Sequence, residues 1–183
     1  NEKPKQLTLV EIDERWVLEL RENYAHTVHI VHGDFLGYDW FRQQRGPVKL
    51  IGNLPYHVTS PILFHILDHA ECAQTAVFMT QKEVARRIVS GPDSKEYGIL
   101  SVLCQVYARV EWLFTVSRGN FYPVPGVDAA VFRMQFKKVD GLDNPALFRK
   151  VVRTSFNYRR KMLRNSLIRI FEKSIVYSLT TVS

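Results

Sequence analysis

The chain has 183 residues, of which 46% are hydrophobic and 23% charged, and its formal net charge is +7. This composition excludes a disordered chain, and the length suits one domain with a good core plus a small appendage. No apolar stretch approaches the ~20 residues of a membrane-spanning helix. Cys72 and Cys104 lack the spacing of a zinc site or a disulfide framework. We therefore expect a monomer of the reducing cytoplasm, with no membrane contact and no metal.

Apolar runs alternate with amphipathic stretches, which favours an α/β fold with a largely parallel sheet covered by helices on both faces. The expected strands are Leu7–Ile12, Val28–Val31, Val48–Ile51, Ala76–Thr80, Val110–Val116 and Ala129–Phe136. The expected helices are Asp13–Tyr24, Ser60–His69, Gln81–Val89 and Ile99–Ala108. Ser60 is the expected N-cap of the second helix, with Pro61 at its first helical position. The last two strands have no helix between them, so we expect them to pair antiparallel.

Turn-forming residues in Asp140–Pro145 predict a linker. It would separate an α/β domain at 1–139 from a helical C-terminal domain at 146–183.

Asn53, Leu54, Pro55 and Tyr56 directly follow the apolar run at 48–52. A strand ending in Asn-x-Pro-aromatic suits methylation of the exocyclic amine of adenine, a poor nucleophile because its lone pair is delocalised into the ring. The Asn53 side-chain oxygen and the Leu54 carbonyl oxygen would accept the two amine hydrogens and draw the lone pair out of conjugation. Pro55 would fix the direction of the Leu54 carbonyl, and Tyr56 would lie on the face of an unstacked base. Taken alone, the tetrapeptide fits a plain strand-to-helix turn equally well.

Six segments resemble, in the same order, the ribosomal RNA adenine dimethyltransferases of the KsgA family. They lie at 10–13, 33–36, 51–62, 81–87, 121–128 and 156–167. The resemblance implies a Rossmann-like class I S-adenosylmethionine-dependent methyltransferase sheet with a small helical C-terminal domain. It also implies dimethylation of two adjacent adenosines near the 3′ end of small-subunit rRNA during ribosome biogenesis.

The family assigns its cofactor contacts to the carboxyl ends of the strands, where ligands of open α/β sheets bind. Glu11 would accept hydrogen bonds from the ribose of S-adenosylmethionine, and Ile12 would pack on its adenine ring. Asp34 would accept from the adenine amine, and Phe35 would donate its backbone N–H. Glu11, Asp34 and Asn53 are expected to converge on one crevice. The plain alternatives are a surface acid at Glu11 and a turn-forming residue at Asp34.

Phe121, in an aromatic–proline loop, would clamp the flipped base from the face opposite Tyr56, although it also fits an aromatic packed under a hairpin. The expected catalytic residues are therefore Asn53, Leu54, Pro55, Tyr56 and Phe121. The expected cofactor-binding residues are Glu11, Ile12, Asp34, Phe35 and Asn53.

The sequence departs from the family at its start. The family has a Gly-rich loop roughly 20 residues before the ribose-binding acid, whereas ten residues precede Glu11 here and none of them is Gly. We expect that the first strand and this loop are missing from a longer protein, and that the C-terminal domain is incomplete.

Basic residues gather between Arg149 and Arg169, where eight Lys or Arg occur without one acid, so the rest of the chain sums to −1. Such a stripe is the expected footprint of a polyanion, although a solvated helix face is the plain alternative. Arg160 and Arg164 are four residues apart and would share one helical face. The expected packing positions of this stretch are Val152, Phe156, Leu163 and Leu167. The expected RNA-binding residues are Arg153, Arg159, Arg160, Lys161 and Arg164.

Two alternatives remain open. One is a methyltransferase of the macrolide-resistance type, which acts on large-subunit rRNA and shares the Asn-x-Pro-Tyr motif. The segment at 159–165 favours the small-subunit group, although Met162 stands where Thr is usual. The other alternative is a non-catalytic rRNA-binding assembly factor, which a true absence of the Gly-rich loop would favour.

Overall fold

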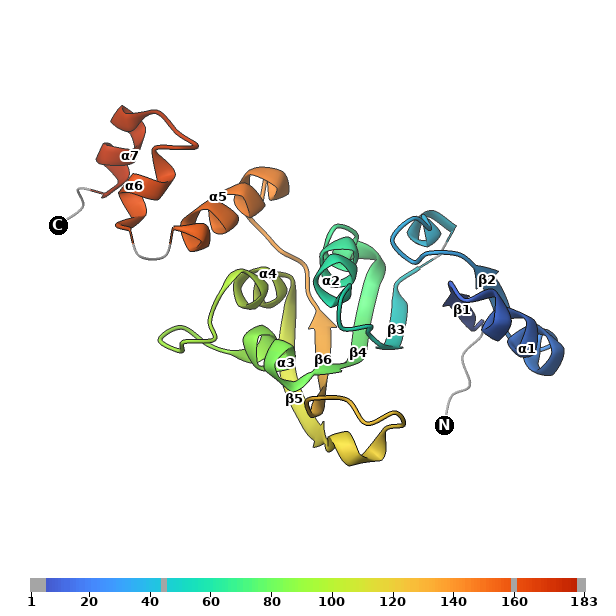
Figure 1. Cartoon of the computed structure of the whole chain (residues 1–183). Coiled ribbons are helices and arrows are strands. Elements are labelled where there is room, and N and C mark those ends of the chain that lie inside the picture. The colour runs from blue at the N-terminus through green and yellow to red at the C-terminus, as the bar shows by residue number, and fades with distance from the viewer. Residues whose placement is uncertain (1–5, 44–45, 159–160, 181–183) are drawn as a thin grey trace. The chain divides into compact units, whose positions relative to one another are not determined.

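The computed structural model describes residues 6–43, 46–158 and 161–180 (Figure 1). The chain divides between Gly46 and Pro47 into two compact units, which we call the amino-terminal unit and the main unit.

The amino-terminal unit is a β-α-β segment. It contains β1 (Thr8–Glu11), α1 (Glu14–Tyr24), β2 (His29–His32) and the short 3-10 helix η1 (Trp40–Gln43). The two strands are parallel, with Glu11 opposite His32. Asp13 caps α1, because its side chain accepts a hydrogen bond from the Arg15 N–H at 3.0 Å. Val17 on this helix is 1% exposed.

The main unit contains a four-stranded sheet in the order β3-β4-β6-β5. Its strands are β3 (Val48–Asn53), β4 (Ala73–Gln81), β5 (Ala108–Val116) and β6 (Ala129–Phe136). Its first helices are α2 (Thr59–Leu67), α3 (Lys82–Val89) and α4 (Ile99–Tyr107), with the short 3-10 helices η2 (Ala70–Cys72) and η3 (Arg118–Asn120). The chain ends in α5 (Pro145–Asn157), α6 (Leu163–Leu167) and α7 (Lys173–Thr180).

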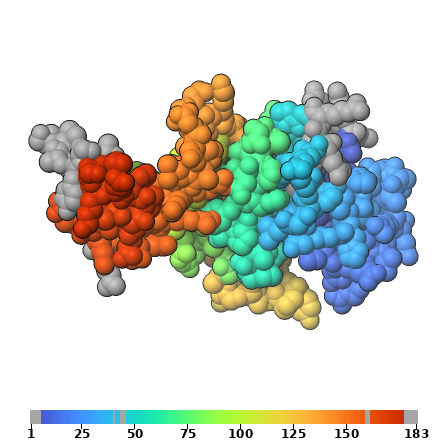
Figure 2. Space-filling model, turned by 90° about the horizontal axis from the view of Figure 1, so that it is seen from above, coloured from blue at the N-terminus to red at the C-terminus, as the bar shows by residue number. Residues whose placement is uncertain are grey.

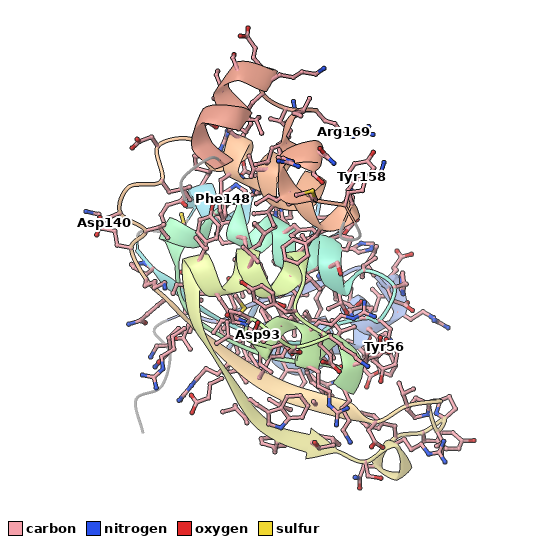
Figure 3. All side chains as sticks on the ribbon, turned by 90° about the vertical axis from the view of Figure 1, so that its left-hand side faces the viewer. Tyr56, Asp93, Asp140, Phe148, Tyr158 and Arg169 are labelled. Atoms are coloured by element: carbon pink, nitrogen blue, oxygen red, sulfur yellow. The ribbon has the colours of Figure 1, made fainter. Side chains whose placement is uncertain are left out.

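The predicted strand directions are confirmed. β3 and β4 are parallel, whereas β6 runs antiparallel to both β4 and β5. Figures 1 and 3 show α2, α3 and α4 on one face of this sheet. They bury Leu63, Ile88 and Leu103 completely, and Phe132 of β6 is equally buried.

Cys104 of α4 is a free cysteine in the core. It is fully buried, and burial raises the pKa of its thiol to about 12. The thiolate is therefore not populated at neutral pH, and the residue serves packing. None of the helices in the described part of the chain has the length and apolar character that crossing a bilayer requires.

The predicted start of the second helix is wrong. α2 begins at Thr59 after Val58, which supplies no side-chain cap, so Ser60 is not the N-cap and Pro61 is the third helical residue. Proline is tolerated there because the first turn of a helix has no partner for its N–H groups. The residue that organises this helix start is Thr59, whose hydroxyl is directed back to the preceding turn.

The basic stretch does not form one helix. α5 ends at Asn157, and the Lys161 N–H donates to the Tyr158 carbonyl oxygen at 2.7 Å, which closes a turn before α6 begins at Leu163. Arg160 lies outside the described residues, so the face it would share with Arg164 stays a prediction, whereas Leu163 is 56% exposed instead of packed. Val152 is buried as expected, whereas Phe156 and Leu167 are half-buried.

Contacts outside the sheet hold α5 on the rest of the main unit. Arg149 forms an ion pair with Asp68, which follows α2, and Phe156 packs edge-on against Tyr97 with 5.9 Å between ring centroids. The division into domains at 1–139 and 146–183 stays a prediction.

A buried pair of hydroxyl groups joins the start of α2 to β4. Thr59 and Thr80 are 1% and 0% exposed, and their Oγ atoms are 3.1 Å apart. The Thr59 hydroxyl also donates to the Pro55 carbonyl oxygen at 3.0 Å, so the Thr80 hydroxyl is the donor within the pair. This short chain of bonds ties the turn after β3 to the strand beside it.

The two hydroxyl groups are not equivalent, and replacing Thr59 or Thr80 by Val measures the contribution of each to the free energy of unfolding. Thr59→Val leaves the Thr80 hydroxyl buried without an acceptor, and we expect it to lower the free energy of unfolding by about 1–3 kcal/mol. Thr80→Val keeps the Thr59 bond to Pro55, and we expect a loss below about 1 kcal/mol. Urea unfolding of the complete protein measures both; equal losses, or none for Thr59→Val, would contradict this arrangement.

Candidate active site

The turn after β3 is fixed by the neighbouring strand β4. Asn53 is the last residue of β3; it is exposed and lies opposite Met79 of β4. Leu54 donates its N–H to the Met79 carbonyl oxygen at 2.9 Å, and its side chain is only 6% exposed. A backbone hydrogen bond and a buried side chain therefore hold the peptide that follows Asn53.

Two oxygen acceptors are available in this turn. Among the described residues, no protein donor bonds the Leu54 carbonyl oxygen or the Asn53 side-chain oxygen. The next carbonyl differs, because the oxygen of Pro55 accepts the Val58 N–H at 3.1 Å and the Thr59 hydroxyl at 3.0 Å. Amide oxygens of consecutive residues are suited to accept the two hydrogens of one amine.

Aromatic residues lie at the same end of the main sheet. The strand register places Gln81 of β4 and Val116 of β5 opposite Ala129 of β6, so the loop at 117–128 lies at the end of the sheet where Asn53 ends β3. We call this segment the aromatic loop. Figure 3 shows Tyr56 at this end of the sheet, and Figure 2 shows the aromatic loop, in yellow, projecting from the molecular surface.

The exposure of the aromatic rings differs. Tyr56 is 38% exposed, Phe121 is half-buried, and Tyr122 is 100% exposed. Tyr122 is absent from the residues expected from the sequence, and its place beside Phe121 in the same motif was the signal that could have identified it. The structure thus places Asn53, Leu54, Pro55, Tyr56 and Phe121 at one end of one sheet.

In the amino-terminal unit, Glu11 ends β1 and its side chain is held by the backbone. Its Oε1 atom accepts the N–H groups of Ile12 and Asp13 at 2.7 and 2.9 Å. Among the described residues, no donor bonds its second carboxylate oxygen. Ile12 beside it is 65% exposed, a large apolar side chain facing solvent next to a free acceptor. These two residues suit the ribose and the adenine ring of a nucleoside.

Asp34 has the turn-forming role that was the plain alternative. Its Oδ1 atom accepts the Leu36 N–H at 2.9 Å, and its backbone oxygen accepts the Gly37 N–H at 3.1 Å. The Gly33 N–H donates to the Glu11 carbonyl oxygen at 2.9 Å, so Asp34 and Glu11 lie at the same end of the parallel pair β1–β2. Phe35 follows there and is half-buried. Cofactor contacts of these residues, and their convergence with Asn53, stay predictions.

A surface hollow of about 510 Å³ lies at the opposite ends of β1 and β2. Leu7, Arg21 and His29 are among the residues that line it, at the starts of the strands and the end of α1. It is therefore separate from the edge that carries Glu11. Within the described residues, His, Cys, Asp and Glu side chains nowhere gather in a group of three able to hold a metal ion.

The basic residues of the C-terminal helices fall into two sets. The Arg153 guanidinium lies 4.8 Å from the centroid of the Phe64 ring, so this exposed cation also packs α5 on α2. Lys161 and Arg169 lie 5.8 and 4.3 Å from the Tyr158 ring centroid, and Figure 3 shows Tyr158 beside Arg169. Arg164 is exposed as well. The predicted RNA contacts Arg159 and Arg160 lie outside the described residues.

Known protein structures share this fold. A dimethyladenosine transferase from Plasmodium falciparum superposes with a TM-score of 0.76 at 25% identity, over 96% of this chain and 62% of the other. The 23S rRNA methyltransferase ErmE superposes with a TM-score of 0.68 at 29% identity, over 95% of this chain and 70% of the other. The predicted class I methyltransferase fold is thereby confirmed.

Curated relatives agree with the structural comparison. A protein of Bacteroides fragilis called ribosomal RNA small subunit methyltransferase A is 45% identical over 93% of this chain and 64% of its own length. Proteins of the same name from Syntrophus aciditrophicus and Xanthomonas euvesicatoria are 43% and 44% identical, over 86% and 91% of this chain and 59% and 65% of their own lengths. The chain thus spans about three-fifths of the relatives it matches. Residues 1–182 match the model of the family called ribosomal RNA adenine dimethylase, and the chain belongs to this family.

Proposed function

We propose that the protein is an S-adenosylmethionine-dependent adenine N6,N6-dimethyltransferase of small-subunit rRNA. Its substrate would be two adjacent adenosines near the 3′ end of that RNA, within the pre-ribosomal small subunit of the cytoplasm, and it would act as a monomer. Membership of the family and the relatives called small subunit methyltransferase A support this substrate. The observation that carries the proposal is the pair of free acceptor oxygens at Asn53 and Leu54.

These oxygens would act directly on the adenine amine. When the Asn53 side chain and the Leu54 carbonyl each accept one N–H, the nitrogen becomes tetrahedral and its lone pair leaves conjugation with the ring. The Leu54 carbonyl can take this part because its own N–H is held by Met79 and its side chain is buried. Catalysis would then come from orientation and from preorganised acceptors.

The aromatic residues would hold the base while it reacts. Tyr56 and Phe121 would lie on opposite faces of the unstacked adenine, and such stacking is worth about 1–3 kcal/mol per base. The fully exposed Tyr122 adds a second aromatic surface on the loop. His57, although adjacent, needs no part as a base, because the released amine proton can pass to solvent.

The amino-terminal unit supplies residues that fit the nucleoside of S-adenosylmethionine. The free carboxylate oxygen of Glu11 suits a ribose hydroxyl, and the exposed Ile12 side chain suits the face of the adenine ring. Asp34 keeps one carboxylate oxygen beyond the one that closes its turn. When bound, the cofactor would supply a methyl group activated by its positively charged sulfonium.

The large-subunit methyltransferases are the nearest competing class, since ErmE shares the fold. The curated relatives at 43–45% identity favour the small-subunit substrate instead. A non-catalytic assembly factor is less consistent with free acceptors in the turn after β3. Assays of the complete protein with small-subunit particles and with large-subunit RNA separate the two methyltransferase classes.

Asn53→Ala removes one of the two acceptors. We expect kcat for methyl transfer to small-subunit RNA to fall by at least about 10²-fold, as for the loss of one preorganised group in other enzymes. RNA affinity should stay within about twofold, because binding along the phosphate backbone does not use this amide. Asn23→Ala is the matched control, since Asn23 bonds only a carbonyl on its own exposed helix. Full turnover by Asn53→Ala would remove this residue from the mechanism.

Lys161→Ala combined with Arg164→Ala tests the RNA surface. Each lost phosphate contact reduces the slope of log affinity against log salt by about 0.7–0.9, so we expect a loss of up to about two in the slope and weaker binding. Lys137→Ala with Lys138→Ala is the matched control, because these two exposed lysines follow β6 outside the stripe. An unchanged slope in the first variant would mean that this surface faces away from the RNA.

A further inference from the structure

The aromatic loop has little apolar burial to hold it in place. Tyr122 is 100% exposed, and Val124 and Val127 are 62% and 46% exposed. The loop begins with η3, whose N-cap Ser117 accepts the Gly119 N–H at 3.4 Å. A loop of this kind samples many conformations unless polar contacts fix it. The half-buried Phe121 can face a base reproducibly only if such contacts exist.

Asp128 provides these contacts at the junction of the loop with β6. Its Oδ1 atom accepts the Arg118 N–H at 3.2 Å, which joins the end of the loop to its beginning. Its Oδ2 atom lies 3.3 Å from the Lys82 Nζ atom, and its backbone oxygen accepts the Lys82 N–H at 3.0 Å. The Arg118 side chain in turn donates to the Gly126 carbonyl oxygen at 3.4 Å. One side chain therefore closes the loop and attaches it to the start of α3.

Lys82, to which Asp128 attaches the loop, lies close in the chain to the residue that fixes the turn after Asn53. Lys82 directly follows β4, and Met79 of that strand accepts the hydrogen bond from Leu54. The two halves of the candidate active site are thus attached at positions three residues apart in the chain, Met79 on β4 and Lys82 directly after it. The contacts at Met79 and at Lys82 therefore attach both halves to one short segment of the chain.

We call the contacts of the Asp128 side chain with Arg118 and Lys82 the clamp. Its carboxylate is charged at neutral pH. The backbone hydrogen bond from Arg118, and then the side-chain bond with Lys82, hold the pKa of Asp128 below its ordinary value. The Lys82 and Asp128 side chains are half-buried, at 33% and 36% exposure, and ion pairs that stay open to solvent in this way contribute little to global stability. The contacts are therefore suited to set the conformation of the loop more than to stabilise the fold.

We propose that Asp128 is a positioning residue: by joining Lys82 to the Arg118 N–H, it holds Phe121 where it can stack on the base gripped at Asn53. The proposal rests on the proposed methyltransferase function. Asp128 acts only through Phe121 and touches neither substrate nor cofactor.

Asp128→Ala in the complete protein tests the clamp in two ways. Amide hydrogen exchange across 117–128 should quicken by about tenfold or more, without RNA or cofactor present. The kcat/KM for methyl transfer should fall about 10- to 100-fold, whereas the Tm should change by no more than about 2 °C. Asp128→Asn keeps an acceptor for the Arg118 N–H and should show a smaller effect of the same kind.

Glu111→Gln is the matched control. It removes the Glu111–Arg133 ion pair between β5 and β6, the strands that the aromatic loop joins, but leaves the contacts of the loop intact. We expect it to change neither the exchange of the loop nor the kinetics. In a Phe121→Ala background, Asp128→Ala should cause no further loss of activity, since the group it positions is gone.

Three outcomes would overturn the proposal. Unchanged exchange in Asp128→Ala would show that the clamp does not hold the loop. An equal loss of activity with and without Phe121 would show that Asp128 acts by another route. Either result leaves the proposed methyltransferase function intact. The third outcome, a complete wild-type protein that transfers no methyl group, would contradict both the proposed function and the positioning role of Asp128.

Discussion

The hydrogen bond from the Leu54 N–H to the Met79 carbonyl oxygen is the constraint on which the candidate active site depends. It continues the parallel register of β3 and β4 by one residue beyond the strand and fixes the plane of the peptide after Asn53. Because side chains alternate along a strand, a slip by one residue would turn Asn53 to the opposite face. The buried Leu54 side chain and the Thr59–Thr80 pair also oppose such a slip. The free acceptors are therefore a property of the register and not of the tetrapeptide alone.

Positive charge in the C-terminal helices has more than one use. Arg149 pairs with Asp68, and Arg153 lies on the Phe64 ring, so part of the stripe attaches α5 to α2 and the residue that follows it. Lys161 and Arg164, beyond the turn at Tyr158, are exposed and free of acidic partners among the described residues. The local charge predicted from the sequence thus overestimates the number of side chains available to an RNA. The break at Tyr158 separates the packing role from the exposed set.

The parts of the fold set by local pattern were predictable from the sequence. Short apolar runs predicted the strands, and the absence of a helix between the last two predicted their antiparallel pairing. The position of Asn53 at a strand end followed from the adjoining apolar run and Pro55. The contacts that join distant segments were not predictable, since Thr59 with Thr80 and Lys82 with Asp128 are separated by 21 and 46 residues. The Ser60–Pro61 pair predicts an N-cap at Ser60, whereas the helix begins at Thr59, whose hydroxyl contacts Thr80 of β4, a contact that the local sequence does not show.

The identity of the methylated atom is the most direct test of the site described here. The complete protein would be incubated with S-adenosylmethionine and small-subunit RNA that lacks the modification, and the nucleosides would be analysed by mass spectrometry after digestion. If Asn53 and Leu54 grip an exocyclic amine, the product is N6,N6-dimethyladenosine, and RNA with purine riboside at the target positions takes up no methyl group. Methyl groups found on a ring nitrogen or a ribose hydroxyl, or on RNA with purine riboside at the target positions, would contradict the role of Asn53 and Leu54 in gripping an exocyclic amine.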